Sequence, residues 1–112
     1  HGPSACAMGF KVQNAKYAFE RALSLGAKPY YEGSVGKGQF DYPAIYGIGD
    51  SLIYFVDDSK PITSFFAHMD ALDPQPQTCL QYIDHLTHNV KRGQMDKWAG
   101  FYEKLFNFRE IR

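Results

Sequence analysis

Two histidines, His85 and His88, lie three residues apart in a stretch whose residue types could bind a metal ion or a small ligand. The hydrophobic pattern predicts a strand over residues 80–90. Side chains of a strand alternate between its two faces, so His85 would point to the same side as Thr87, and His88 to the other. In a regular strand the two imidazoles are therefore unable to share one metal ion.

The two sides of this predicted strand differ in polarity. His85, Thr87 and Asn89 form a polar side, which suits a ligand cavity better than a packed core. The other side carries Leu86 and Val90, which a following helix could bury. Spacing alone leaves two interpretations of His85 open, a metal ligand or a hydrogen-bonded structural residue. We interpret the remaining histidines as structural: His1, His68 and His88.

No other segment carries a recognised catalytic pattern. The Gly-x-Ser-x-Gly motif of hydrolases is absent. The loop around Lys37 differs from a phosphate-binding loop, because Gly38 follows the lysine and Glu32 stands where the first glycine is needed. A metal site of the oxygenase type needs two histidines and one carboxylate around one metal ion. His85 supplies at most one of these three ligands.

The composition excludes several classes of protein. With 112 residues the chain forms one small domain or parts of two. Twelve Lys and Arg balance twelve Asp and Glu, which argues against a nucleic-acid or membrane-surface partner. No apolar run approaches the roughly 18 residues that span a bilayer. Two cysteines, Cys6 and Cys79, are too few for a disulfide framework, so we expect reduced thiols in a cytoplasmic protein.

The first half of the chain predicts one complete unit of strands and a helix. A strand over 8–12 precedes a helix over 15–23, which Asn14 would cap and Gly26 would end. A short extended segment at 29–31 follows. Two further strands, 40–46 and 51–56, are joined by a hairpin turn at 47–50.

The second half repeats the beginning of this pattern. Residues 57–79 form a connection with a strand at 62–67, and the predicted strand at 80–90 then precedes a helix over 95–106. Another strand begins at 108–111. A strand–helix–strand pattern thus occurs twice, and the second copy stops where its hairpin should begin. These elements predict an α+β fold with a mostly antiparallel sheet.

Three blocks of the sequence closely resemble the bacterial 4-hydroxyphenylpyruvate dioxygenase family. The most specific block is Tyr82-Ile83-Asp84-His85-Leu86-Thr87-His88-Asn89-Val90, followed by Arg92-Gly93, Met95-Asp96 and the run from Trp98 to Phe108. The second combines Pro43-Ala44-Ile45, Gly47-Ile48-Gly49 and the run from Ser51 to Asp57. The third is the opening His1-Gly2-Pro3 with its strand and helix. Because the chain starts at His1 rather than Met, we expect a piece of a longer protein.

The resemblance implies the vicinal-oxygen-chelate fold, which is built from βαβββ modules, here one complete and one truncated. It assigns residues 1–72 to the second module of a metal-free N-terminal domain, and 73–79 to a linker. Residues 80–112 would begin the iron-binding C-terminal domain. The repeat found from the residues alone agrees with this division.

The resemblance also implies a function. His85 matches the first Fe(II) ligand of the family, and Thr87 a position beside the substrate-binding pocket, while the second histidine and the glutamate ligand would lie beyond Arg112. The family is an oxidoreductase of tyrosine catabolism, converting 4-hydroxyphenylpyruvate and O2 to homogentisate and CO2. We expect a homo-oligomer, and no activity from the 112 residues alone. The alternative is a stand-alone small-ligand-binding module of the same fold, without catalysis.

Overall fold

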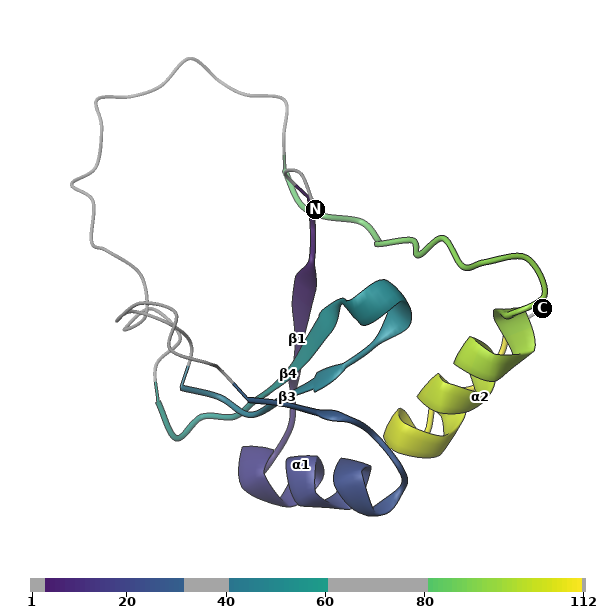
Figure 1. Ribbon diagram of the computed structural model, residues 1–112. Helices are drawn as coiled ribbons and strands as arrows, with labels where there is room; N and C mark the ends of the chain where they lie inside the picture. Colours follow the sequence, from purple (N-terminus) through teal and green to yellow (C-terminus); the bar gives the residue numbers. More distant parts are fainter. Residues whose placement is uncertain (1–3, 32–40, 61–80, 112) are drawn as a thin grey trace.

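The computed structural model describes residues 4–31, 41–60 and 81–111 (Figure 1). Its centre is a mixed four-stranded sheet in the order β1-β4-β3-β2. The strands are short: Ala7–Lys11 (β1), Pro29–Tyr30 (β2), Ala44–Tyr46 (β3) and Leu52–Val56 (β4). β1 runs parallel to β4, while the β2–β3 and β3–β4 pairs are antiparallel. The prediction of a mostly antiparallel sheet is therefore confirmed.

Helix α1, Ala15–Ser24, connects β1 to β2 and begins where the sequence predicts. The Oδ1 atom of Asn14 accepts a hydrogen bond from the backbone N–H of Tyr17 at 2.8 Å, which satisfies one of the unpaired donors of the first turn. Gly26 follows the helix with φ +96°, a left-handed conformation that a residue without Cβ adopts at no steric cost. Both predicted helix boundaries are confirmed.

The connection between β3 and β4 is a short 3-10 turn, η1, over Ile48–Asp50. Gly47 precedes this turn. A larger residue there would be crowded, because its Cβ would lie 3.0 Å from the side chain of Ile53. Gly49 and Asp50 both have φ of +60°. The predicted hairpin is confirmed, although its first strand is shorter than predicted.

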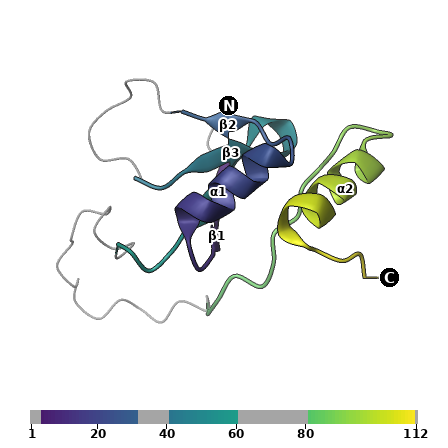
Figure 2. The ribbon, with the colours of Figure 1, turned by 90° about the horizontal axis from the view of Figure 1, so that it is seen from below.

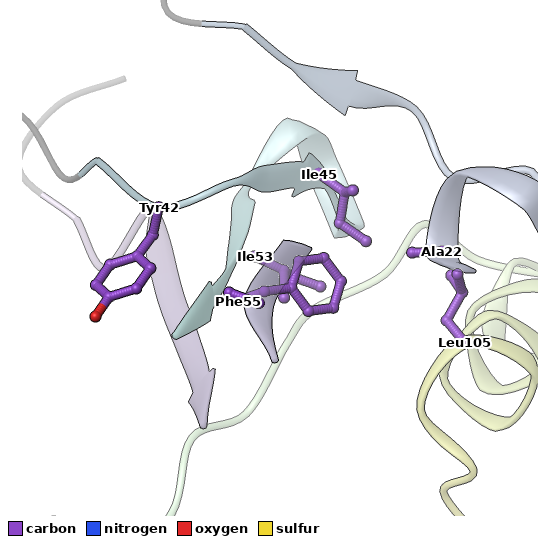
Figure 3. Close-up of a cluster of buried hydrophobic side chains, with 7 residues drawn as sticks. Ala22, Tyr42, Ile45, Ile53, Phe55 and Leu105 are labelled. Carbon is purple, nitrogen blue, oxygen red and sulfur yellow. The ribbon is translucent and has the colours of Figure 1, made fainter. Parts of the chain in front are cut away.

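The core lies on one face of the sheet. Pairing of β1 with β4 sets Met8 beside Ile53 and Phe10 beside Phe55, so these side chains share that face. Phe55, Ile45 and Ile53 are the largest fully buried side chains, each worth roughly 1.5–3 kcal/mol of burial. Figure 3 shows them together with Ala22 of α1.

Helix α2, Met95–Phe106, has the bounds that its apolar stripe predicts. It ends at Asn107, which is in the left-handed conformation with φ +57°. Its side chains pack on the core face beside α1: Leu105 is buried, and the Phe106 ring lies 5.0 Å from that of Phe10 and 5.8 Å from that of Phe55. Figures 1 and 2 both show α1 and α2 as neighbours.

The predicted strands on either side of α2 are wrong in this structure. Residues 81–91 and 108–111 have no regular secondary structure, and the Tyr82 and Ile83 side chains are exposed. A strand needs a neighbour to pair its N–H and C=O groups, and no described strand runs beside either segment. The predicted loop at 33–38, strand at 62–67 and linker at 73–79 lie outside the described residues. Within the described ranges, no helix has the length and apolar character to cross a membrane.

Candidate functional site

The segment 81–91, which leads into α2, carries the sequence-predicted site residues. Both His85 and Thr87 are exposed. The Nδ1 atom of His85 is hydrogen-bonded to the carboxylate of Asp84, and the same pair of side chains forms an ion pair when the imidazole is protonated. A carboxylate partner on Nδ1 favours the tautomer whose Nε2 carries the lone pair, which is the usual arrangement of a metal-binding histidine.

The metal-ligand set around His85 is incomplete. Among residues 4–31, 41–60 and 81–111 no group of three His, Cys, Asp or Glu side chains lies close enough to hold a metal ion. A site with two histidines and one carboxylate needs such a group. The described residues therefore do not fit an iron site by themselves, and His85 contributes one ligand at most.

A cavity of about 510 Å³ lies between this segment, β1 and α2. It is mainly apolar, and its polar groups are three ionic side chains, the imidazole of His88 and the phenol of Tyr102. The complete lining is Met8, Phe10, Ile48, Leu86, His88, Ala99, Tyr102, Glu103, Phe108, Arg109 and Glu110. Burial raises the pKa of the Tyr102 phenol. A cavity of this kind suits a small ligand with an apolar body.

The alternation predicted from the sequence is kept only at residues 85–88. Leu86 and His88 line the apolar cavity together with Ala99 and Tyr102 of α2, whereas His85 and Thr87 do not. Leu86 and His88 of the side assigned to helix packing thus face α2, but Asn89 of the polar side also lines a cavity with residues of α2. The sequence did not predict that His88 would line a cavity. The opposite wall comes from β1, which is distant in the chain, and no local pattern indicates that contact.

The comparisons with known proteins decide the family. Residues 1–70 match the family model described as hydroxyphenylpyruvate dioxygenase, HPPD, N-terminal. The chain belongs to this family. The HPPD resemblance and the α+β fold expected from the sequence are both confirmed, since the described elements from β1 to β4 form one complete βαβββ module.

Curated relatives match the chain along its whole length. It is 48% identical over 112 residues to 4-hydroxyphenylpyruvate dioxygenase of Legionella pneumophila (strain Corby), covering 100% of the chain and 32% of that relative. It is 48% identical over 118 residues to hemolysin VllY of Vibrio vulnificus, covering 100% of the chain and 33% of the relative. The chain thus spans about a third of the length of these relatives.

A solved structure of a related protein has a fold similar to that of this HPPD-family chain. The structure of a xylose isomerase-like TIM barrel/4-hydroxyphenylpyruvate dioxygenase fusion protein matches with a TM-score of 0.74 at 29% identity. The match covers 100% of this chain and 18% of the fusion protein.

Proposed function

We propose that this chain is part of an iron(II)-dependent 4-hydroxyphenylpyruvate dioxygenase. This oxidoreductase converts 4-hydroxyphenylpyruvate and O2 to homogentisate and CO2, a step of tyrosine catabolism. One observation carries the proposal, the 48% identity across all 112 residues to a relative of that name. We further propose that the enzyme is a cytoplasmic homo-oligomer, and the exposed free thiol of Cys6 fits a reducing compartment.

The proposed division of the chain follows the same relationship. We assign residues 1–72 to a metal-free N-terminal domain, 73–79 to a linker and 80–112 to the start of the iron-binding domain. The family model of the N-terminal region ends at residue 70, which supports a boundary near that point. The last strand of the complete βαβββ module, β4, ends at Val56, well before the proposed linker.

Within this enzyme we propose that His85 is one of the iron ligands and that Thr87 lies beside the substrate. The bond from Asp84 to His85 Nδ1 supports the first assignment, because it leaves Nε2 for the metal. The other ligands must come from outside the described residues, which hold no complete set. Iron would supply the site at which O2 and the α-keto acid meet.

The first experiment is to read the encoding DNA beyond the codon for Arg112. A frame that continues and supplies a further histidine and a glutamate agrees with the dioxygenase, whereas an immediate stop codon contradicts it. The 112 residues alone should then show no oxygen uptake with Fe(II), ascorbate and 4-hydroxyphenylpyruvate. Robust turnover by the 112-residue chain would refute the role of a partial iron site.

In the full-length enzyme, His85→Ala and His88→Ala make a matched pair. Both side chains belong to the exposed segment before α2, but only His85 is proposed to bind iron. His85→Ala should abolish oxygen uptake and lower the bound iron measured by atomic emission. His88→Ala should retain the iron, because its imidazole lines the apolar cavity instead. Full iron content in the His85→Ala protein would disprove the ligand assignment.

The apolar cavity favours a second candidate, a small-ligand-binding module without catalysis. Its volume of about 510 Å³ accommodates a molecule with one or two rings. A ligand that binds only the folded chain raises the melting temperature. A metal-independent rise with an apolar ligand, lost in a Leu86→Asp variant, would favour this function, and an unchanged melting temperature would exclude it.

A further inference from the structure

A second cavity, which we call the cation cavity, lies where the η1 turn faces the approach to α2. Its volume is about 780 Å³. Three segments form its walls: residues 26–28 and 46–50 of the βαβββ module, and residues between 89 and 101 that lead into and form α2.

Four basic side chains line this cavity: Lys28, Lys91, Arg92 and Lys97. Asp50 is the single carboxylate of the lining. The whole chain is neutral, with twelve basic and twelve acidic residues, so this excess is local. Positive charges gathered at one concave surface raise the local concentration of anions.

The four cations have no counter-ion within the described part of the chain. Lysines elsewhere do pair: Lys11 Nζ lies 2.9 Å from a carboxylate oxygen of Asp58, and Lys60 pairs with Asp41. No such pair joins the cation cavity to a described carboxylate. An anionic ligand would therefore meet basic groups that are not already neutralised.

Aromatic rings accompany these charges. Tyr46, Trp98 and Phe101 belong to the same lining, and the Trp98 and Phe101 ring centroids lie 5.2 Å apart in an edge-to-face arrangement. The Nζ atom of Lys97 lies 5.2 Å from the centre of the Trp98 ring, within the range of a cation–π interaction. The cavity thus combines cations with surfaces on which a second ring can pack.

We propose that the cation cavity binds a small aromatic carboxylate. The Arg92 guanidinium and the lysine ammonium groups would recognise the carboxylate, since a guanidinium donates two parallel hydrogen bonds to such a group. Asp50 in the lining and Asp96 in the first turn of α2 offset part of this positive charge, and the planar guanidinium matches the two oxygens of a carboxylate. The proposal is independent of the dioxygenase assignment, because His85 is not part of this lining.

Trp98 provides the measurement, because it is the single tryptophan of the chain. Titration of 4-hydroxyphenylacetate into the 112-residue protein should change Trp98 fluorescence with a dissociation constant on the order of 1 mM, as expected for a ligand of this size in an open site. Acetate and p-cresol test the charge and the ring separately, and each should bind about tenfold more weakly. Equal binding of acetate or inorganic phosphate would overturn the aromatic part of the proposal.

Matched variants of α2 test which cations take part. Lys97→Ala removes a lining residue, whereas Lys104→Ala removes an exposed lysine of the same helix that is not in the lining. An exposed ion pair is worth up to about a fivefold change in affinity, so Lys97→Ala and Arg92→Ala should each weaken binding roughly three- to fivefold. Lys104→Ala should leave it unchanged.

Amide chemical shifts give a second readout that does not depend on the Trp98–Lys97 contact. Ligand should shift the amide signals of Gly47 and Gly49 in the native protein, and less so in the Arg92→Ala variant at the same concentration. Circular dichroism establishes that each variant folds. The proposal is wrong if neither the fluorescence nor these amides respond, or if Lys104→Ala weakens binding as much as Lys97→Ala.

Discussion

The guanidinium of Arg21 donates a hydrogen bond to the backbone carbonyl of Leu105, with 2.9 Å between Nη1 and the oxygen. The two residues are 84 positions apart and belong to α1 and α2. Figure 3 shows the Leu105 side chain facing Ala22, the neighbour of Arg21 in α1. Carbonyls in the last turn of a helix lack partners within the helix and attract positive charge. One side chain of the βαβββ module thus helps hold the end of α2.

Replacing Arg21 with alanine should loosen α2. The change removes a half-buried hydrogen bond from a charged donor and leaves the Leu105 carbonyl without that partner, at a cost of about 1–2 kcal/mol in the free energy of unfolding. Urea unfolding followed by Trp98 fluorescence reports directly on α2. Lys16→Ala, an exposed change on the same helix, should alter stability by less than about 0.5 kcal/mol. Equal effects of the two variants would contradict the specific role of Arg21.

The cap at Asn14 should carry a measurable share of the stability. Asn14→Ala removes the acceptor of the Tyr17 N–H and should lower the free energy of unfolding by about 1 kcal/mol. Asn14→Ser keeps an oxygen at the same place and should restore most of the loss. Chemical denaturation of the three proteins makes the comparison, and an alanine variant as stable as the native chain would show that the cap is unimportant.

Asp57 should make the stability depend on pH in the acidic range. Its carboxylate accepts hydrogen bonds from the Ser59 hydroxyl and N–H and from the Ala15 N–H at the start of α1. These bonds, with the Ser59 hydroxyl as the largest contribution, lower the pKa of Asp57 below its ordinary 3.8. Because the folded-state pKa is the lower one, the stabilisation is complete above 3.8 and is lost as the pH falls through the folded-state value.

The measurement is the melting temperature of the native protein and of Asp57→Asn between neutral and strongly acidic pH. On acidification the melting temperature of the native protein should fall further than that of the variant, because the variant lacks the titrating group. Glu20→Gln removes an exposed carboxylate from α1 and should leave the acid dependence as it is. Parallel curves for the native protein and Asp57→Asn would rule out the proposed linkage.

Local signals explain why so much of the module could be predicted from sequence. Asn14 and Gly26 fix the ends of α1 through contacts within a few residues, and the apolar stripe of α2 needs only helical periodicity. The two-residue alternation around Met8 and Phe10 likewise predicts the strand β1. All of these depend on short-range geometry, which the sequence displays directly.

The remaining features depend on partners that are distant in the chain. Alternation at 80–90 resembles a strand, but a strand forms only where another strand pairs with it, and none does so among the described residues. The parallel pairing of β1 with β4 joins residues about 45 positions apart. Lys28 reaches the same cavity as Lys97 for the same reason, and no motif links them.

The rings of Phe106 and Phe108 allow a final test of how α2 is held on the sheet. Phe106 is partly buried and packs against Phe10 and Phe55, whereas Phe108, beyond the helix, is 49% exposed. Truncating a buried phenylalanine costs about 3–5 kcal/mol, and partial burial places Phe106→Ala near or below the lower end of this range. Phe108→Ala should cost about 1 kcal/mol, because half of its surface is already in water.

Two probes separate loss of α2 docking from global unfolding. In Phe106→Ala, hydrogen exchange should accelerate at the α2 amides while the β4 amides, which pair with both β1 and β3, stay protected. In Phe108→Ala, both sets should exchange nearly as in the native protein. Uniform acceleration across α2 and β4 in the Phe106 variant would mean that the helix and the module unfold as one cooperative unit, and the idea of a separately docked α2 would have to be abandoned.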